Sequence, residues 1–343
     1  MKRDSNYDLM RIYAMCMVIL NHIADRFVMI EKVNSNPWYN NEYTYICESI
    51  SHCAIPLFLM LTGVYVLDKA ERLQAREFYK SSLKKLGIPF LIFVIVYFFY
   101  DIYVTRTKTI RIIFSGIITG FSGMYAHWYM VMLSVVYAFI PLLAFIRRNV
   151  SWNSWRNGTI TFFVWVMLGH FFESSVVTWS LSNMYLLGYV LLGNMLHQLF
   201  NKIKKSNFKG TLLIVIGLLI LFLNGIILDK IVCLGGDYYN KLVTLYSAPL
   251  VIVGSVVIFS GFSLLSIKFK LKSLAEISYI VFLSHKILID VISKRIFSIL
   301  EQKFCYNILN LILIEYIIVL PLVLVGGFLM FRLINKIRLC RRR

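Results

Sequence analysis

Apolar residues in this chain fall in long runs, which are separated by short segments rich in lysine and arginine. A helix needs about 20 predominantly apolar residues to cross the hydrocarbon core of a bilayer. The two-residue alternation of half-buried strands is not the prevailing pattern, and neither is the narrow apolar stripe of soluble amphipathic helices. The pattern predicts ten transmembrane helices, near residues 8–28, 44–67, 86–104, 127–146, 159–177, 181–200, 210–228, 241–261, 272–294 and 306–332.

The predicted fold is an all-α polytopic bundle that forms a single transmembrane domain over residues 1–343. No connecting segment between the runs is long enough to be a separate soluble domain. The composition agrees, because 59% of the residues are hydrophobic and the mean hydropathy is +0.72. We expect the first run to stay in the mature protein, since Arg11 lies near its start and no small-residue cleavage site follows it.

The net charge is +19, and the Lys and Arg residues are distributed unevenly between the two sides of the membrane, as in a topology signal. With the N-terminus placed in the cytoplasm, 24 of the 36 Lys and Arg residues fall on the cytoplasmic side and 10 on the outer side. The remaining two, Arg11 and Lys286, lie within predicted helices. This asymmetry predicts that both termini are cytoplasmic. Basic loops that set the topology and contact lipid headgroups account for most of the positive charge. We therefore expect no nucleic-acid partner.

Ionisable residues interrupt the first apolar run, which reads LMRIYAMCMVILNHIADRF over residues 9–27. Arg11 and His22 are eleven residues apart, which is within about 20° of three full helical turns, so they share one face roughly 16 Å apart. Asp25 follows His22 at the i+3 position, where a carboxylate orients an imidazole ring. Charges inside a span are costly unless they face protein or water. This helix is therefore predicted to line a cavity, although hydrogen bonding to neighbouring helices is the simpler alternative.

Ionisable residues also interrupt the ninth apolar run, SLAEISYIVFLSHKILIDVI. Ser278 and His285 are seven residues apart and share a face, about 20° short of two turns. Lys286 and Asp290 are spaced to neutralise each other within the helix. His285 has two interpretations, a hydrogen-bonding histidine inside the bundle or a member of a site. The histidines and the six scattered cysteines lack the spacing of metal ligands, so we expect no metal site.

A basic segment, DKAERLQAREFYKSSLKKLGIPF, precedes the third run. Ammonium and guanidinium groups bind phosphates, so such a cluster suits a polyanionic cytosolic cosubstrate. Contact with anionic lipid is the alternative for most of its members. Lys84 and Lys85 lie at the entrance of the predicted helix and are the stronger candidates, with Arg76 about two helical turns earlier on the same segment.

The order of these motifs resembles the integral-membrane acyltransferase 3 family. An Arg, ten residues and then a His in the first span is similar to that family's defining motif. Four further segments resemble its other conserved stretches, CAIPLFLMLTGVYVL, FYKSSLKKLGIPFLIF, HWYMVMLSVVYAFIPLL and LAEISYIVFLSHKILI. The resemblance extends from residue 7 to about residue 332 and identifies the chain as a stand-alone member.

The resemblance implies an O-acyltransferase of the cell membrane in a bacterium. It would use cytoplasmic acyl-CoA, with acetyl-CoA as the expected cosubstrate and no bound cofactor. The acceptor would be a hydroxyl of a cell-surface glycan or of a lipid-linked saccharide. The sequence specifies neither the acceptor nor an oligomeric state.

Roles for individual residues follow from this resemblance together with the helix geometry. Arg11 would hold the donor with Lys84, Lys85 or Arg76. His22, oriented by Asp25, would act as general base or carry the acyl group covalently. The residues expected to bind the acceptor are His127, Trp128, Ser278 and His285.

A transporter or flippase for a polysaccharide or a lipid-linked intermediate is the alternative function. A polar-lined helical bundle with charges at both ends also suits that role. The two classes differ in chemistry, because an acyltransferase consumes acyl-CoA in detergent whereas a transporter needs a sealed membrane.

Overall fold

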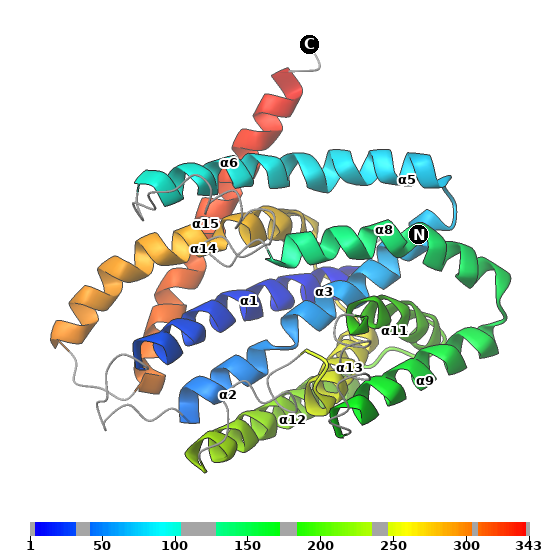
Figure 1. Ribbon diagram of the computed structural model, residues 1–343, viewed down its shortest axis with the longest axis horizontal. Coiled ribbons are helices and arrows are strands. Elements are labelled where there is room, and N and C mark those ends of the chain that lie inside the picture. Colours follow the sequence, from blue (N-terminus) through cyan, green and yellow to red (C-terminus); the bar gives the residue numbers. More distant parts are fainter. Residues whose placement is uncertain are drawn as a thin grey trace.

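The computed structural model describes residues 4–31, 42–103, 128–171, 184–234, 246–303 and 308–340. These residues form no strand, which confirms the prediction of an all-α fold for the part of the chain that they cover. Figure 1 shows the helices in chain order from blue to red. The elements are α1 (Ser5–Glu31), α2 (Glu42–Ser51), α3 (Ala54–Thr62), η1 (Gly63–Leu67), α4 (Asp68–Ala70), α5 (Ala75–Ser82), η2 (Leu83–Gly87), α6 (Ile88–Tyr103), α8 (Trp128–Asn149), α9 (Trp152–Phe171), α11 (Tyr185–Phe200), α12 (Asn207–Cys233), α13 (Pro249–Leu264), α14 (Lys272–Lys303) and α15 (Ile308–Cys340).

Each of the ten apolar runs overlaps one of these helices or a set of consecutive ones. Within the described ranges, five helical stretches are long and apolar enough to cross a membrane, and α13 is a shorter apolar helix. These helices indicate a multi-pass membrane protein, whereas the total of ten crossings remains a prediction. The five stretches are Tyr43–Ala70, Ala75–Tyr100, Tyr129–Asn149, Asn207–Cys233 and Leu309–Leu333.

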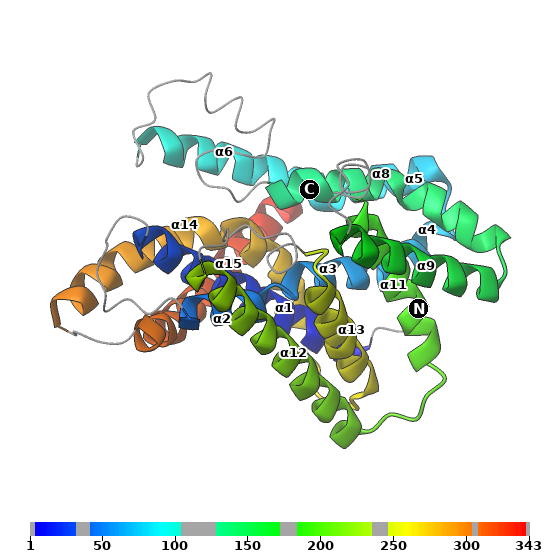
Figure 2. The same cartoon turned by 60° about the horizontal axis from the view of Figure 1, so that its bottom comes forward.

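Helix α1 lies at the centre of the molecule. It packs against α2, α3, α13, α14 and α15, and Figures 1 and 2 both show it enclosed by these neighbours. Two further pairs complete the bundle, with α12 against α13 and α14 against α15. The apolar core is continuous across α1, α3, α8, α11, α13 and α14. The polar side chains of α1 therefore face other helices.

The second predicted helix is broken in the structure. Residues 52 and 53 form a turn between α2 and α3, and Pro56 lies in the first turn of α3. Proline has no N–H to donate to the carbonyl four residues earlier, which here belongs to His52. After this break the chain continues through α3, η1 and α4 to Ala70.

The basic segment before the third apolar run is helical and not an extended loop. A turn at residues 71–74 separates α4 from α5. From Ala75 on, α5, η2 and α6 follow one another without interruption. They form the long cyan row in Figure 1. Phe78 is buried while Arg76 and Lys80 are exposed, so the charges of this segment form the outer face of an amphipathic helix.

Two glycines allow α11 to approach α3 and η1 closely. A Cβ at Gly193 would lie 2.1 Å from the carbonyl oxygen of Met60, and a Cβ at Gly63 would lie 2.0 Å from that of Val190. Small residues at helix contacts are a general means of packing membrane helices closely. This contact holds η1 in place, and with it the side chain of Tyr65.

We predict that Gly193→Ala strongly destabilises the protein, because the methyl group would meet the Met60 backbone and could be accommodated only by separating α3 from α11. The cost should exceed about 1–3 kcal/mol, which is typical of overpacked cores. The measurement is the apparent Tm of the purified protein in detergent. Gly158→Ala in α9 is the matched control, since a Cβ there has nothing within 4 Å. Equal melting temperatures for the two variants would contradict this view of the contact.

Candidate functional site

Two histidines from α1 and α14 lie against each other. The ring centroids of His22 and His285 are 4.9 Å apart, and their planes are inclined by 30°. Two segments that are far apart in sequence therefore bring their ionisable residues to one place. We refer to His22 and His285 as the histidine pair.

One hydrogen bond determines which nitrogen of His285 carries its proton. The carbonyl oxygen of Phe282 lies 2.5 Å from His285 Nδ1, and a carbonyl only accepts, so Nδ1 carries the hydrogen. In the neutral ring, Nε2 is then an acceptor. Among the residues that the structure describes, neither His285 Nε2 nor His22 Nδ1 has a hydrogen-bonding partner. The pair thus presents buried ring nitrogens that are available to a ligand.

Charged groups next to the histidine pair are compensated across the helix contact. The charge of Lys286 interacts with the carboxylates of Asp25 and Asp290, and it also acts on His22. Asp290 in turn accepts a hydrogen bond of 2.7 Å from the Tyr100 hydroxyl of α6. The opposite charges of Asp25 on α1 and Lys286 on α14 therefore attract each other next to the histidine pair.

A cavity of about 410 Å³ surrounds Arg11. Its size falls within the range of small-molecule sites, roughly 300–1,000 Å³. The Arg11 guanidinium lies over the ring of Tyr65, 5.5 Å from its centroid. The walls carry both charge and aromatic hydroxyls, and they consist of Arg11, Phe58, Leu61, Thr62, Tyr65, Val66, Lys85, Leu86, Tyr129, Leu133, Tyr137, Ala275, Glu276, Ser278, Tyr279 and Phe282.

Both π-helical segments contribute to this cavity. Tyr65 and Val66 come from η1, and Lys85 and Leu86 come from η2. A π turn is uncommon, and single π turns inside α-helices are frequent at functional sites. Arg11 and Lys85 give the cavity two cations against the single carboxylate of Glu276, so it favours an anionic ligand.

Phe282 links the cavity to the histidine pair. Its ring lines the cavity and lies 5.4 Å from the ring of His285, centroid to centroid. Tyr129 and Phe58 pack against Phe282, with ring centroids at 4.8 and 6.3 Å. One aromatic side chain therefore separates the cationic cavity from the two histidines.

The structure brings several of the predicted site residues together. Arg11, Lys85 and Ser278 line the cavity, and His285 joins His22 beside it. The Ser278 hydroxyl donates to the carbonyl of Ala275 at 2.8 Å.

Other predicted residues lie elsewhere. Lys84 and Arg76 are exposed and do not line the cavity. Trp128 begins α8, but its side chain lies outside the described part of the chain, as does the whole of His127. Within the described ranges, no three His, Cys, Asp or Glu residues converge as metal ligands would.

The sequence did not predict most of the aromatic residues that line the Arg11 cavity. Tyr65 and Tyr279 lie inside two of the motifs noted in the sequence, so their position beside a site was accessible. Tyr129 and Tyr137 also lie inside a noted motif, HWYMVMLSVVYAFIPLL, but their spacing did not predict that their side chains line the Arg11 cavity. Phe282 is an ordinary apolar residue in sequence, and only the packing of α14 gives it its position.

Comparison with known proteins gives one match. A family model described as an acyltransferase domain matches residues 4–332, which is nearly the whole chain and includes every element that forms the cavity and the histidine pair. Neither the curated proteins nor the solved structures contain a match to this chain.

An ion pair anchors α1 one turn after His22. Arg26 Nη1 lies 2.7 Å from Glu315 Oε1 of α15, and the Glu315 side chain is only 2% exposed. Tyr316, the next residue of α15, donates a hydrogen bond of 3.3 Å to the Cys16 carbonyl of α1. These contacts hold the His22 end of α1 against α15.

We predict that Arg26→Met destabilises the protein by about 3–5 kcal/mol, because it leaves the Glu315 carboxylate buried without its partner. The double variant Arg26→Met, Glu315→Met should recover much of the loss, since it buries no charge at all. Thermal unfolding of the three proteins in the same detergent measures the effect. Additive losses in the double variant would show that the pair does not couple α1 to α15.

Proposed function

Because the chain belongs to the acyltransferase 3 family, we propose that it is a membrane O-acyltransferase that uses acyl-CoA, with acetyl-CoA as the expected donor. The acceptor is a hydroxyl of a cell-surface glycan or of a lipid-linked precursor. One observation carries the proposal, namely a cationic cavity whose wall residue Phe282 packs on His285, which in turn lies against His22. This arrangement provides an anion-binding site and, next to it, buried ring nitrogens that can accept a proton.

In this proposal the donor binds in the cavity around Arg11. The guanidinium of Arg11 and the ammonium of Lys85 contact the phosphates or the pantetheine carbonyls, and the tyrosine hydroxyls of the wall offer further hydrogen bonds. The ten helices cross the cell membrane with both termini in the cytoplasm, so the Arg11 end of α1 faces the cytosolic donor. Lys84 and Arg76 are exposed and do not line the cavity, so in this proposal they attract the polyanion without binding it in the site.

The chemical step takes place at the histidine pair. His22 removes the proton of the acceptor hydroxyl, and the oxygen attacks the thioester carbonyl carbon. The C–S bond breaks, CoA leaves as the thiolate, and the proton held by His22 passes to that sulfur. Alternatively, His22 itself attacks the thioester and transfers the acyl group to the hydroxyl in a second step. The thioester supplies the free energy in both routes.

His285 positions the acceptor. Its Nδ1–H is held by the Phe282 carbonyl, so its Nε2 accepts a hydrogen bond from a second hydroxyl of the same glycan. Vicinal hydroxyls are abundant on sugars, which suits a site with two adjacent ring nitrogens. Asp25 neutralises Lys286 beside the pair and thereby keeps an uncompensated cation away from the basic nitrogen. Trp128, His127 and Ser278 complete the acceptor site in this proposal.

We predict that His22→Gln lowers CoA release from acetyl-CoA by about 10²–10⁴-fold, the range expected when a general base is lost. The assay follows free CoA with purified protein in detergent and a glycan extract as acceptor. His197→Gln is the control, because His197 is a histidine that bonds Tyr7 and Asn201 away from the cavity and from the histidine pair. Its turnover should match that of the unmodified protein.

Two results would count against this assignment. A folded His22→Gln protein with full turnover would remove His22 from the chemistry. An unmodified protein that neither binds acetyl-CoA nor releases CoA would favour transport of a glycan or lipid-linked intermediate without chemistry.

We predict that Arg11→Gln raises the KM for acetyl-CoA by about 10–100-fold, which corresponds to the loss of about 1.5–3 kcal/mol for a hydrogen bond to a charged group. Lys85→Gln should raise KM about tenfold, since Lys85 is more exposed than Arg11. The effect on kcat should be smaller in both variants, because neither residue lies at the histidine pair. Initial rates at varied acetyl-CoA separate the two parameters.

Comparison of the adjacent residues Lys84 and Lys85 tests whether the cavity lining, and not positive charge in general, determines the KM for acetyl-CoA. Lys84→Gln removes the same charge one residue away, outside the cavity wall, so its KM should rise less than that of Lys85→Gln. Lys230→Gln on the exposed end of α12 is the control for a general loss of positive charge. Equal KM values for Lys84→Gln and Lys85→Gln would show that the cavity wall does not select between them.

A further inference from the structure

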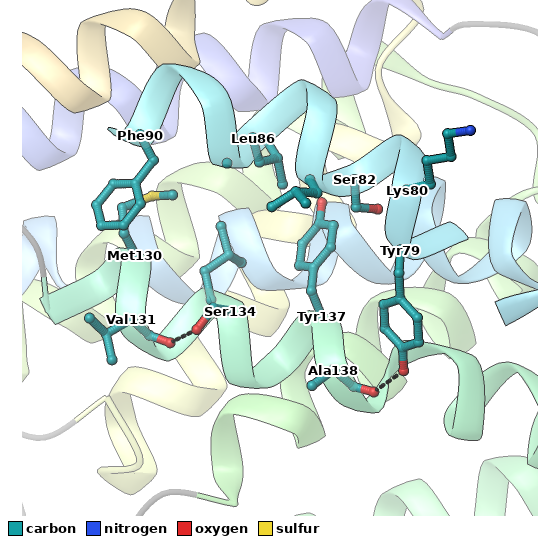
Figure 3. Close-up of a pocket in the computed structure, with 13 residues that line it drawn as sticks. Tyr79, Lys80, Ser82, Leu86, Phe90, Met130, Val131, Ser134, Tyr137 and Ala138 are labelled. Carbon is teal, nitrogen blue, oxygen red and sulfur yellow. Dashed lines mark hydrogen bonds between the residues drawn. The ribbon is translucent and has the colours of Figure 1, made fainter. Parts of the chain in front are cut away.

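A second cavity lies beside the one around Arg11. It occupies about 460 Å³ between the continuous helix α5–η2–α6 and helix α8, as Figure 3 shows. We call it the side groove. It is lined by Tyr79, Lys80, Ser82, Leu83, Leu86, Gly87, Phe90, Met130, Val131, Leu133, Ser134, Tyr137 and Ala138.

The side groove presents an apolar surface. Two of its hydroxyls are already used within the protein, because Tyr79 donates to the Ala138 carbonyl at 2.7 Å and Ser134 donates to the Val131 carbonyl at 2.6 Å. Among the residues that line it, Lys80 is the charged one, and in Figure 3 its ammonium group extends away from Leu86 and Phe90. A ligand of this groove is therefore a hydrocarbon chain.

The groove and the Arg11 cavity share a wall. Leu86, Leu133 and Tyr137 line both spaces. Met130, at the Phe90 end of the groove, directly follows Tyr129, whose ring packs on Phe282 next to the histidine pair. The groove and the Arg11 cavity therefore adjoin each other along α8.

The π turn η2 presents a charged residue to one space and apolar residues to the other. Lys85 lines the Arg11 cavity, Leu83 and Gly87 line the groove, and Leu86 between them lines both. Five consecutive residues therefore present an ammonium group to one space and hydrocarbon to the adjoining one. The matching ligand has a polar, anionic part continuous with an apolar chain.

We propose that the side groove binds the acyl chain of the donor, so that the protein transfers acyl groups longer than acetyl. This inference rests on the proposed function, because the anionic part of the same ligand is the CoA moiety that is proposed to bind in the Arg11 cavity. An acyl chain of the donor is favoured over a tail of a membrane lipid because Leu86, Leu133 and Tyr137 line both spaces, so the groove adjoins the cavity in which the donor is proposed to bind. Each methylene moved from water into the groove should strengthen binding about fourfold, the equivalent of about 0.8 kcal/mol.

The test compares acetyl-, butyryl-, hexanoyl- and octanoyl-CoA as donors, with the protein in lipid nanodiscs and kcat/KM for CoA release as the measured quantity. We expect turnover of all four donors, with KM falling as the chain lengthens. Ser134→Phe places a ring in the groove and should lower the octanoyl-to-acetyl ratio of kcat/KM at least tenfold. Ala138→Phe provides the same obstruction at a second position if the first variant does not fold.

The matched control is Val135→Phe. Val135 adjoins Ser134, is 52% exposed and does not line the groove, so a ring there should leave the ratio unchanged. Turnover of acetyl-CoA without any of hexanoyl- or octanoyl-CoA would overturn the inference while leaving the proposed function intact. An equal loss for all donors in Ser134→Phe, or no change in its ratio, would also overturn it and would leave the groove to a lipid tail. If the unmodified protein turns over none of the donors, the proposed function itself fails.

Discussion

The cost of placing ionisable groups in hydrocarbon determines where α1 lies. An arginine, a histidine or an aspartate costs several kcal/mol inside a bilayer unless protein or water surrounds it. Helix α1 carries such groups along much of its length, and five other helices pack around it. Three of its charges have an identified neighbour: Arg11 lies over Tyr65, Arg26 pairs with Glu315, and the charge of Asp25 interacts with that of Lys286. The residues that make α1 unsuited to lipid are thus the ones that place it at the centre.

Close contacts between helices fix the positions of the side chains that surround Arg11. The approach of α3 and η1 to α11 depends on Gly63 and Gly193, which have backbone atoms where a Cβ would be. That contact orients η1, and η1 supplies Tyr65 beneath the Arg11 guanidinium. On the opposite side of the cavity, η2 supplies Lys85. A cation in a membrane protein is held most firmly when the backbone that surrounds it has little freedom, and small residues provide this by packing helices closely.

Periodicity predicted the helices and the shared face of Arg11 and His22, because both depend only on the regular geometry of a helix. It also placed Ser278 and His285 on one face of α14. The contact between His22 and His285 was beyond such reasoning, since it depends on how α1 packs against α14. The choice between Lys84 and Lys85 was beyond it too. A π turn changes the angular spacing of the residues around it, so the direction of each lysine does not follow from 100° per residue. The break before α3 was readable in principle from Pro56, but the apolar run across it obscured the signal.

The separation of the cavity from the histidine pair has a chemical consequence under the proposed reaction. A thioester next to an activated base is open to hydrolysis, and exclusion of water is what limits such side reactions. The rings of Phe58, Tyr129 and Phe282 pack together at this boundary, so the space between the cations and the histidines is lined by aromatic carbon. The cations that bind the donor then remain on one side of this partition, and the neutral ring nitrogens that accept a proton remain on the other. A cation in direct contact with the histidines would oppose their protonation during the transfer. Under the proposed reaction, Phe282 therefore keeps the charges of the donor site apart from the histidines.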